Sequence, residues 1–195
     1  ECFLGLFPGW GGTQLLPILI GADAAVTVII ENALSQNRML NPVKAHELGI
    51  FDELLDSADF LEESIRWAVR VVNGEHTVQR PEIDRGKAWD DAIARAKQIV
   101  QARTHGASPA VNKAVELLEL ARNNDLDAGY AAETEALADA LVSDELRAGL
   151  YSFDLTQKRA KRPAGAPDKS LARDVKKVGV VGAGLMAGQL ALLFV

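Results

Sequence analysis

Apolar residues recur every three or four positions over most of this chain, which is the spacing of one face of an amphipathic helix. Breaks in the pattern fall at Gly21, at Asn73 with Gly74, and at Pro109. The pattern predicts helices over residues 13–20, 22–32, 42–48, 59–72, 89–103, 110–121, 128–141 and 144–159. We therefore expect a mostly helical chain, with Ser143 as the N-cap of the last of these helices.

Two short segments are predicted as strands. Residues 50–55 form an apolar segment directly after Gly49, and residues 175–181 read Val-Lys-Lys-Val-Gly-Val-Val. A glycine-rich turn follows the second segment, and the apolar run from Leu185 to Val195 predicts one more helix. The expected fold class is therefore α/β overall, with helices in the large majority.

The beginning of the chain combines an acid with a glycine-rich turn. Pro8, Gly9, Gly11 and Gly12 favour a turn in which backbone N–H groups face a ligand without an intervening Cβ. Glu1 precedes the apolar segment 2–6, whose burial would suit its carboxylate to general acid or base catalysis. On these residues alone, a purely structural role for acid and turn stays open beside the catalytic one.

Residues 1–17 read Glu-x-x-x-Gly-Leu-x-Pro-Gly-x-Gly-Gly-Thr-Gln-x-Leu-Pro. This pattern resembles the second active-site segment of the enoyl-CoA hydratase (crotonase) superfamily. The resemblance implies that Glu1 is one of two glutamates that handle the added water, and that the Gly9 N–H helps to hold that water. The family's other glutamate and a glycine-rich oxyanion-hole segment precede this motif, and neither occurs in these 195 residues. We therefore expect Glu1 to be an internal residue of a longer protein.

A second motif lies between the predicted strand 175–181 and the last predicted helix. Gly182, Gly184 and Ala187 form the pattern Gly-x-Gly-x-x-Ala. In this context the glycines allow a tight turn and a close approach of backbone to a pyrophosphate, and the alanine allows close helix packing. Ordinary packing of small residues is the alternative. With its preceding strand, the motif resembles the start of the NAD-binding domain of 3-hydroxyacyl-CoA dehydrogenases, which implies NAD as the cofactor.

Charge narrows the classes of partner. The net charge of −6 and the pI near 5.1 argue against a general nucleic-acid surface, because phosphate binding requires a basic face. Residues 158–162 form the one basic cluster, which is interpreted as a solvated hinge, with attraction of coenzyme A phosphates as the alternative. Residues 178–195 carry no charge, but their four glycines argue against a membrane span.

Other reactive side chains are interpreted as structural. The three histidines lack the spacing of a ligand pair, so no metal site is predicted. Cys2 is interpreted as a small buried apolar residue, and a single cysteine fits a reducing compartment. Solvated helix faces are the interpretation for the acids Glu116, Glu119, Glu133, Glu135 and Asp139.

Together the two motifs resemble the multifunctional fatty-acid β-oxidation proteins, of the trifunctional enzyme alpha-subunit type. This implies residues 1–105 as the end of a crotonase-like module, 106–160 as a helical tail, 161–174 as a basic linker and 175–195 as the start of a Rossmann domain. The implied activity is hydration of 2-enoyl-CoA followed by NAD-dependent oxidation of 3-hydroxyacyl-CoA.

Two alternatives to this activity remain. One is a crotonase-type isomerase, and the other is a non-catalytic helical segment that binds a thiolase partner. The expected partners are an acyl-CoA substrate, a thiolase subunit and further copies of the full-length protein, without nucleic acid or a membrane span. The expected location is the bacterial cytoplasm, or the mitochondrial matrix in a eukaryote.

Overall fold

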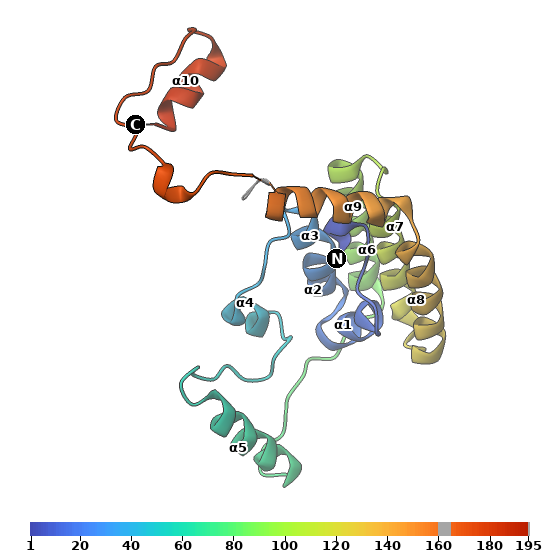
Figure 1. Ribbon diagram of the computed structural model, residues 1–195. Coiled ribbons are helices and arrows are strands. Elements are labelled where there is room, and N and C mark those ends of the chain that lie inside the picture. Colours follow the sequence, from blue (N-terminus) through green and yellow to red (C-terminus); the bar gives the residue numbers. More distant parts are fainter. Residues whose placement is uncertain (160–164, 195) are drawn as a thin grey trace. The chain divides into compact units, whose positions relative to one another are not determined.

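Helices make up almost all of the regular structure of this chain (Figure 1). The computed structural model describes residues 1–159 and 165–194, and no strand occurs among them. Two units result, Glu1–Asp154 and Leu155–Val195, and each is described by itself. The prediction of a mostly helical chain is confirmed.

The first unit contains nine α-helices within residues 1–154. A 3₁₀ turn, Cys2–Leu4, precedes them, a π-helical turn, Thr27–Glu31, joins the second helix to the third, and a 3₁₀ turn, Ala121–Asn123, follows the seventh. The helices are α1 (Gly12–Ile20), α2 (Ala22–Val26), α3 (Asn32–Leu34), α4 (Pro42–Glu47), α5 (Phe60–Val72), α6 (Lys87–Thr104), α7 (Pro109–Leu120), α8 (Leu126–Leu141) and α9 (Asp144–Asp154). Every helix predicted within these residues is present.

Side-chain caps explain where several helices begin. The Asn41 side chain accepts a hydrogen bond from the Lys44 N–H at 2.8 Å, with Pro42 at the first helical position of α4. The Ser143 hydroxyl accepts one from the Leu146 N–H at 3.1 Å, so the predicted N-cap of α9 is confirmed. These caps supply acceptors for N–H groups that have no partner within the helix.

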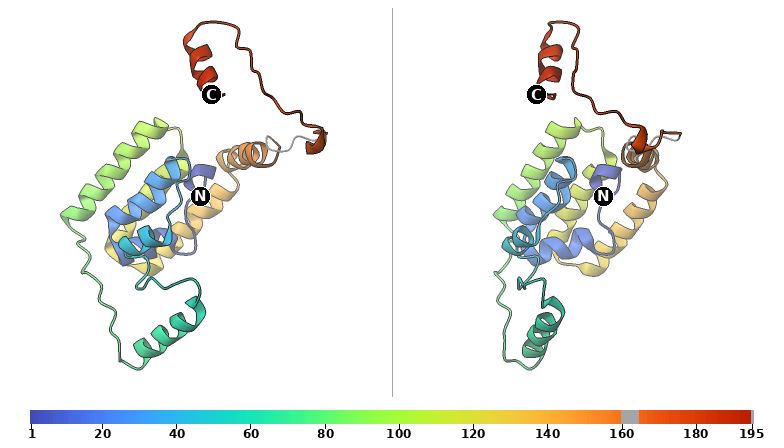
Figure 2. Two further views of the ribbon diagram at one scale, coloured as in Figure 1. Left: turned by 90° about the vertical axis from the view of Figure 1, so that its left-hand side faces the viewer. Right: turned by 60° about the vertical axis from the view of Figure 1, so that its left-hand side comes forward.

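The core of the first unit forms where α2 and the π-helical turn pack on α6 and α7. In both views of Figure 2, blue α2 lies alongside green α6. Many of the contact residues are alanine or valine, which lets the helix axes approach closely. The most deeply buried apolar residues include Ala25, Val26, Ile30, Trp89, Ala96, Val111, Ala114 and Leu118.

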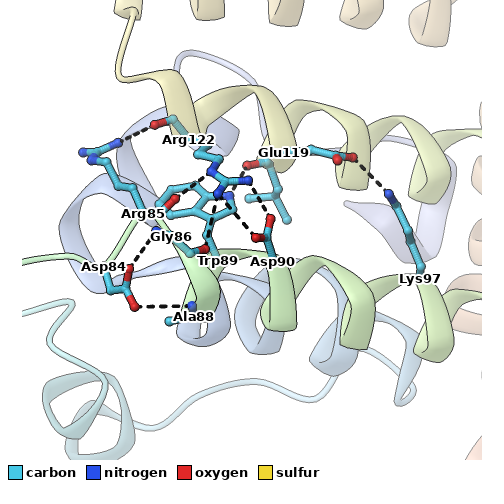
Figure 3. A network of polar contacts seen from close by, with 10 residues as sticks. Asp84, Arg85, Gly86, Ala88, Trp89, Asp90, Lys97, Glu119 and Arg122 are labelled. Carbon is cyan, nitrogen blue, oxygen red and sulfur yellow. Dashed lines mark hydrogen bonds and ion pairs between the residues drawn. The ribbon is translucent and has the colours of Figure 1, made fainter.

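A polar network fixes the start of α6 on the end of α7 (Figure 3). The indole N–H of the fully buried Trp89 donates to the Leu118 carbonyl at 3.1 Å. Arg122 donates to the Arg85 carbonyl at 2.6 Å and pairs with Asp90 at 2.6 Å. Because these bonds join residues about thirty positions apart, they set the register between the two helices.

Neither predicted strand is present in the described residues. Residues 50–55 and 175–181 have no regular secondary structure. A strand needs a neighbouring strand for its backbone N–H and C=O groups, and no such neighbour occurs in the described part of the chain. At the first segment, Arg80 instead bonds the Gly49 carbonyl at 3.2 Å and pairs with Asp52.

Helix α5 has the predicted extent, but its apolar face lies open. None of its residues is buried, and large apolar side chains along it are half exposed or more: Phe60, Leu61, Ile65, Val69 and Val72. Its opposite face carries Glu62 and Glu63 paired with Arg66. The helix is therefore amphipathic as predicted, while its apolar side is not covered by the described residues.

The second unit holds a π-helical turn, Leu155–Arg159, a 3₁₀ turn, Lys169–Leu171, and α10, Leu185–Leu192. The helix predicted to begin at Leu185 is confirmed. The basic cluster at 158–162 and the start of the linker fall largely outside the described residues, as does Val195.

Close packing of α9 on the first turn generates a prediction about Gly149. A Cβ at this position would overlap the Leu4 carbonyl and lie 2.8 Å from its carbon. Both are backbone atoms, so Gly149→Ala should lower the free energy of unfolding by about 1–3 kcal/mol. The cost of this overlap exceeds the gain in helix propensity from replacing glycine by alanine. Urea unfolding followed by circular dichroism measures the change.

The matched control for that experiment is Ala148→Ser, one position away on the exposed side of α9. A surface change of this kind should stay within about 0.5 kcal/mol of the parent chain. Equal stability of the Gly149→Ala and parent chains would contradict the close approach of α9 to Leu4.

Candidate functional site

The glycine-rich turn predicted at the start of the chain is present and leads directly into α1. Gly11 caps α1 with a φ of 83°, and Trp10 before it has a φ of 52° with its side chain 96% exposed. The Gly12 N–H donates to the Gly9 carbonyl at 3.0 Å, which closes the turn. Left-handed backbone at two successive positions explains why a glycine is needed here.

A buried carboxylate from α8 holds this turn. Glu133 is 2% exposed, and its Oε1 accepts a hydrogen bond from the Gly11 N–H at 2.5 Å. Its Oε2 accepts from the Thr13 N–H at 2.9 Å and from the Thr13 hydroxyl. The anion thus lies at the N-terminus of α1, where free N–H groups and the helix dipole stabilise negative charge.

Residues one helical turn before and after Glu133 on α8 pack closely against residues 9–14. A Cβ on Gly129 would lie 2.8 Å from the Cδ of Gln14, a buried side chain that bonds the Leu117 carbonyl at 3.1 Å. Similarly, a Cβ on Gly9 would lie 2.6 Å from the Leu137 side chain. The turn and α8 therefore approach closely on both sides of the carboxylate.

Helix α9 packs against residues 4 and 5 of the opening segment, which is residues 1–14. A Cβ on Gly5 would lie 2.8 Å from the Glu145 side chain, and Gly5 has a φ of 89°. The Glu145 carboxylate also accepts from the Ser108 hydroxyl at 2.6 Å and from the Ala110 N–H at 2.9 Å, which caps α7. One acid thereby connects α9, α7 and the opening segment.

A cavity of about 350 Å³ lies beside the predicted catalytic acid. Its lining includes Glu1 and Cys2, with Pro8 and Gly12 from the glycine-rich turn. Glu1 is exposed, and its carbonyl accepts from the Leu4 N–H at 2.8 Å. Cys2 is buried as interpreted, and burial raises the pKa of its thiol to about 12, so the side chain is a neutral apolar group.

Gly9, the predicted water ligand, is half-buried in the turn. Within the described residues its N–H donates to no protein acceptor, while its carbonyl is used by Gly12. An uncommitted N–H in a fixed turn is a donor that a water or an anion can use. Gly9 itself does not line the cavity, although Pro8 and Gly12 on either side of it do.

The second predicted site is built from backbone alone. Gly182 has a φ of 117°, Gly184 is the N-cap of α10, and the Ala187 N–H donates to the Gly184 carbonyl at 3.0 Å. A Cβ on either glycine would meet no described atom within 4 Å. The turn therefore has open space in front of its glycines, at the start of a helix.

Nowhere in the described part of the chain do three or more His, Cys, Asp or Glu side chains gather into a group that could hold a metal ion. No helix within residues 1–159 and 165–194 combines the length and the apolar character that crossing a membrane requires.

Glu133 lies in surroundings that differ from those predicted by its sequence pattern. Its interpretation as part of a solvated face is wrong, because the side chain is buried against the glycine-rich turn. A local signal exists: Gly129 and Ala136 lie four and three positions from Glu133 on the same side of α8. An acid amid small residues on one helix face indicates close approach of another backbone.

No family model matches the chain. The alpha subunit of a fatty acid oxidation complex from Shewanella frigidimarina is 28% identical over 196 residues, covering 98% of this chain and 27% of that protein. A peroxisomal fatty acid beta-oxidation multifunctional protein from Arabidopsis thaliana is 26% identical, covering 98% of this chain and 26% of that protein.

The chain thus spans about a quarter of the length of these curated relatives. Similarity extends over both units, from the glycine-rich turn of the first to the Gly-x-Gly-x-x-Ala motif of the second, since the match leaves out only 2% of the chain. The predicted resemblance to the multifunctional proteins of fatty acid β-oxidation is therefore confirmed along nearly the whole chain.

Proposed function

We propose that this chain is part of an enzyme that hydrates 2-enoyl-CoA and then oxidises the resulting 3-hydroxyacyl-CoA with NAD. Residues 1–105 would belong to a crotonase-like module, 106–160 to a helical tail, 161–174 to a linker and 175–195 to a Rossmann domain. The observation that carries this proposal is the turn at Gly9, held in one conformation next to a cavity that Glu1 lines.

In the hydration step, Glu1 would act as general acid and base. Glu1 is exposed and lines the cavity, so its carboxylate would be accessible for proton exchange with a water that enters. The Gly9 N–H would orient that water, because it is a donor without a protein acceptor in the described residues. A donor fixed before the reaction requires no reorganisation when the water attacks.

In the oxidation step, Gly182, Gly184 and Ala187 would seat the pyrophosphate of NAD. The open space in front of both glycines and the start of α10 directly after its N-cap Gly184 fit a phosphate group. When bound, NAD supplies the acceptor for the hydride of the 3-hydroxyacyl group. The contribution of this chain is to bind and orient the cofactor through backbone N–H groups.

The names of the relatives favour this proposal over its rivals. One is a subunit of a fatty acid oxidation complex and the other a β-oxidation multifunctional protein, whereas neither name describes an isomerase or a non-catalytic segment. We further propose an acyl-CoA substrate and a thiolase subunit as the partner of the full-length protein. The expected cytoplasmic or mitochondrial location stays a prediction.

The first test is Glu1→Gln in the full-length protein. Loss of the proton-transfer group should lower kcat for hydration of a 2-enoyl-CoA by about 10²–10⁴-fold. Oxidation of a 3-hydroxyacyl-CoA by the same preparation should stay near the parent value, because it uses a different site. The exposed acid Glu82, changed to Gln, serves as the control and should leave both activities unchanged. Equal loss of the two activities in Glu1→Gln would refute the assignment.

The second test is Gly184→Val, with NAD binding measured by titration calorimetry. A branched side chain at the N-cap of α10 would fill the space in front of the turn, so NAD affinity should fall by at least about tenfold. Gly179→Ala, in the preceding segment, is the control and should bind NAD as the parent protein does. Unchanged affinity in Gly184→Val would remove the motif from the cofactor site.

A further inference from the structure

We infer that Glu133 is a positioning residue of the hydration site, acting on the reaction through the turn that carries the Gly9 N–H. This inference rests on the hydration activity proposed above. Glu133 lies on α8, in the helical tail, and is 120 residues or more from the groups it binds. The helical tail would then contribute a residue that positions the hydration site, in addition to connecting the two modules.

The contact geometry restricts the turn immediately after Gly9. Three donors converge on one carboxylate: the Gly11 N–H at 2.5 Å, the Thr13 N–H at 2.9 Å and the Thr13 hydroxyl. The Gly12 N–H, between them, binds the Gly9 carbonyl at 3.0 Å. The position of the carboxylate therefore sets the orientation of the Gly9 peptide through two further peptide units.

The role requires a carboxylate and not merely a polar side chain. All three partners are donors, and the two carboxylate oxygens of Glu133 only accept. An amide of the same shape would direct an NH₂ group at one set of donors and lose those bonds. Among the ion pairs of the described residues none involves Glu133, so its charge is balanced by N–H groups and the dipole of α1.

Apolar side chains on either side of the Glu133 carboxylate pack against the same glycine-rich turn. Leu137, one helical turn further along α8, lies where a Cβ on Gly9 would be, and Tyr130 lies against Gly11. Loss of the Glu133 bonds would let the turn relax while these apolar contacts remain. A shift of about 1 Å in a donor that orients a reactant is enough to lower a rate by ~10²-fold.

The test is Glu133→Gln in the full-length protein, with both activities measured. We expect kcat for hydration to fall by about 10²-fold, with KM for the enoyl-CoA within about twofold, because Glu133 itself touches no substrate. Oxidation of 3-hydroxyacyl-CoA should be unchanged. The matched control is Glu135→Gln, an exposed acid on the same helix, which should leave both activities at the parent level.

A conservative variant separates positioning from packing. Glu133→Asp keeps the charge and both acceptors but shortens the reach by one methylene, so it should recover part of the hydration rate lost in Glu133→Gln. Thr13→Val removes one donor and leaves two, so it should give an intermediate loss. Failure of Asp to exceed Gln would overturn the proposed role.

The remaining outcomes also test the positioning role of Glu133. If Glu133→Gln leaves the hydration kcat within about twofold of the parent while Glu1→Gln abolishes it, the hydration activity stands and the positioning role is overturned. If both activities fall together with helix content, Glu133 is only structural, which again overturns the role. Absence of hydration by the parent protein would refute the proposed function, and the positioning role with it.

Discussion

The bonds from the Glu133 carboxylate to the glycine-rich turn are the interaction on which the site depends. Burying an isolated carboxylate costs several kcal/mol, and only a full set of donors offsets that cost. Gly11 and Thr13 supply three such donors from the start of α1. The turn also gains, because its N–H groups would otherwise lack acceptors in a buried place. Each side of the contact therefore requires the other.

Close packing also holds the rest of the opening segment against the helices that follow it in the chain. At three places a glycine allows close contact between this segment and α8 or α9. Gly5 lies against Glu145, Leu4 against Gly149, and Gln14 against Gly129. Such approaches are closed to any residue with a Cβ. Because α8 and α9 also pack on one another and α8 packs on α7, the opening segment is connected to the core around Trp89 and Leu118. The turn is held at several points for this reason, and a fixed donor is what the proposed orientation of a water by the Gly9 N–H requires.

Much of this fold follows from local pattern. Apolar spacing, the proline at α4, and the Ser143 cap of α9 are read from a few neighbouring residues, and the helices lie where these signals put them. The strand predictions at 50–55 and 175–181 were wrong for a physical reason: a strand is completed by a partner, and the described residues provide none. The burial of Glu133 was missed because a single helix does not reveal what packs against it.

By itself the sequence determined the helices, the glycine-rich turn, the motif at Gly182 and the resemblance to the multifunctional β-oxidation proteins, since each of these is local in the chain. Tertiary structure alone decided which residues hold the turn. The partners Gly11 and Glu133 are 122 positions apart, and helix periodicity carries no information on contacts at that separation. Only folding brings the acid to the N-terminus of α1, where its charge and its acceptors fit the donors that the turn presents.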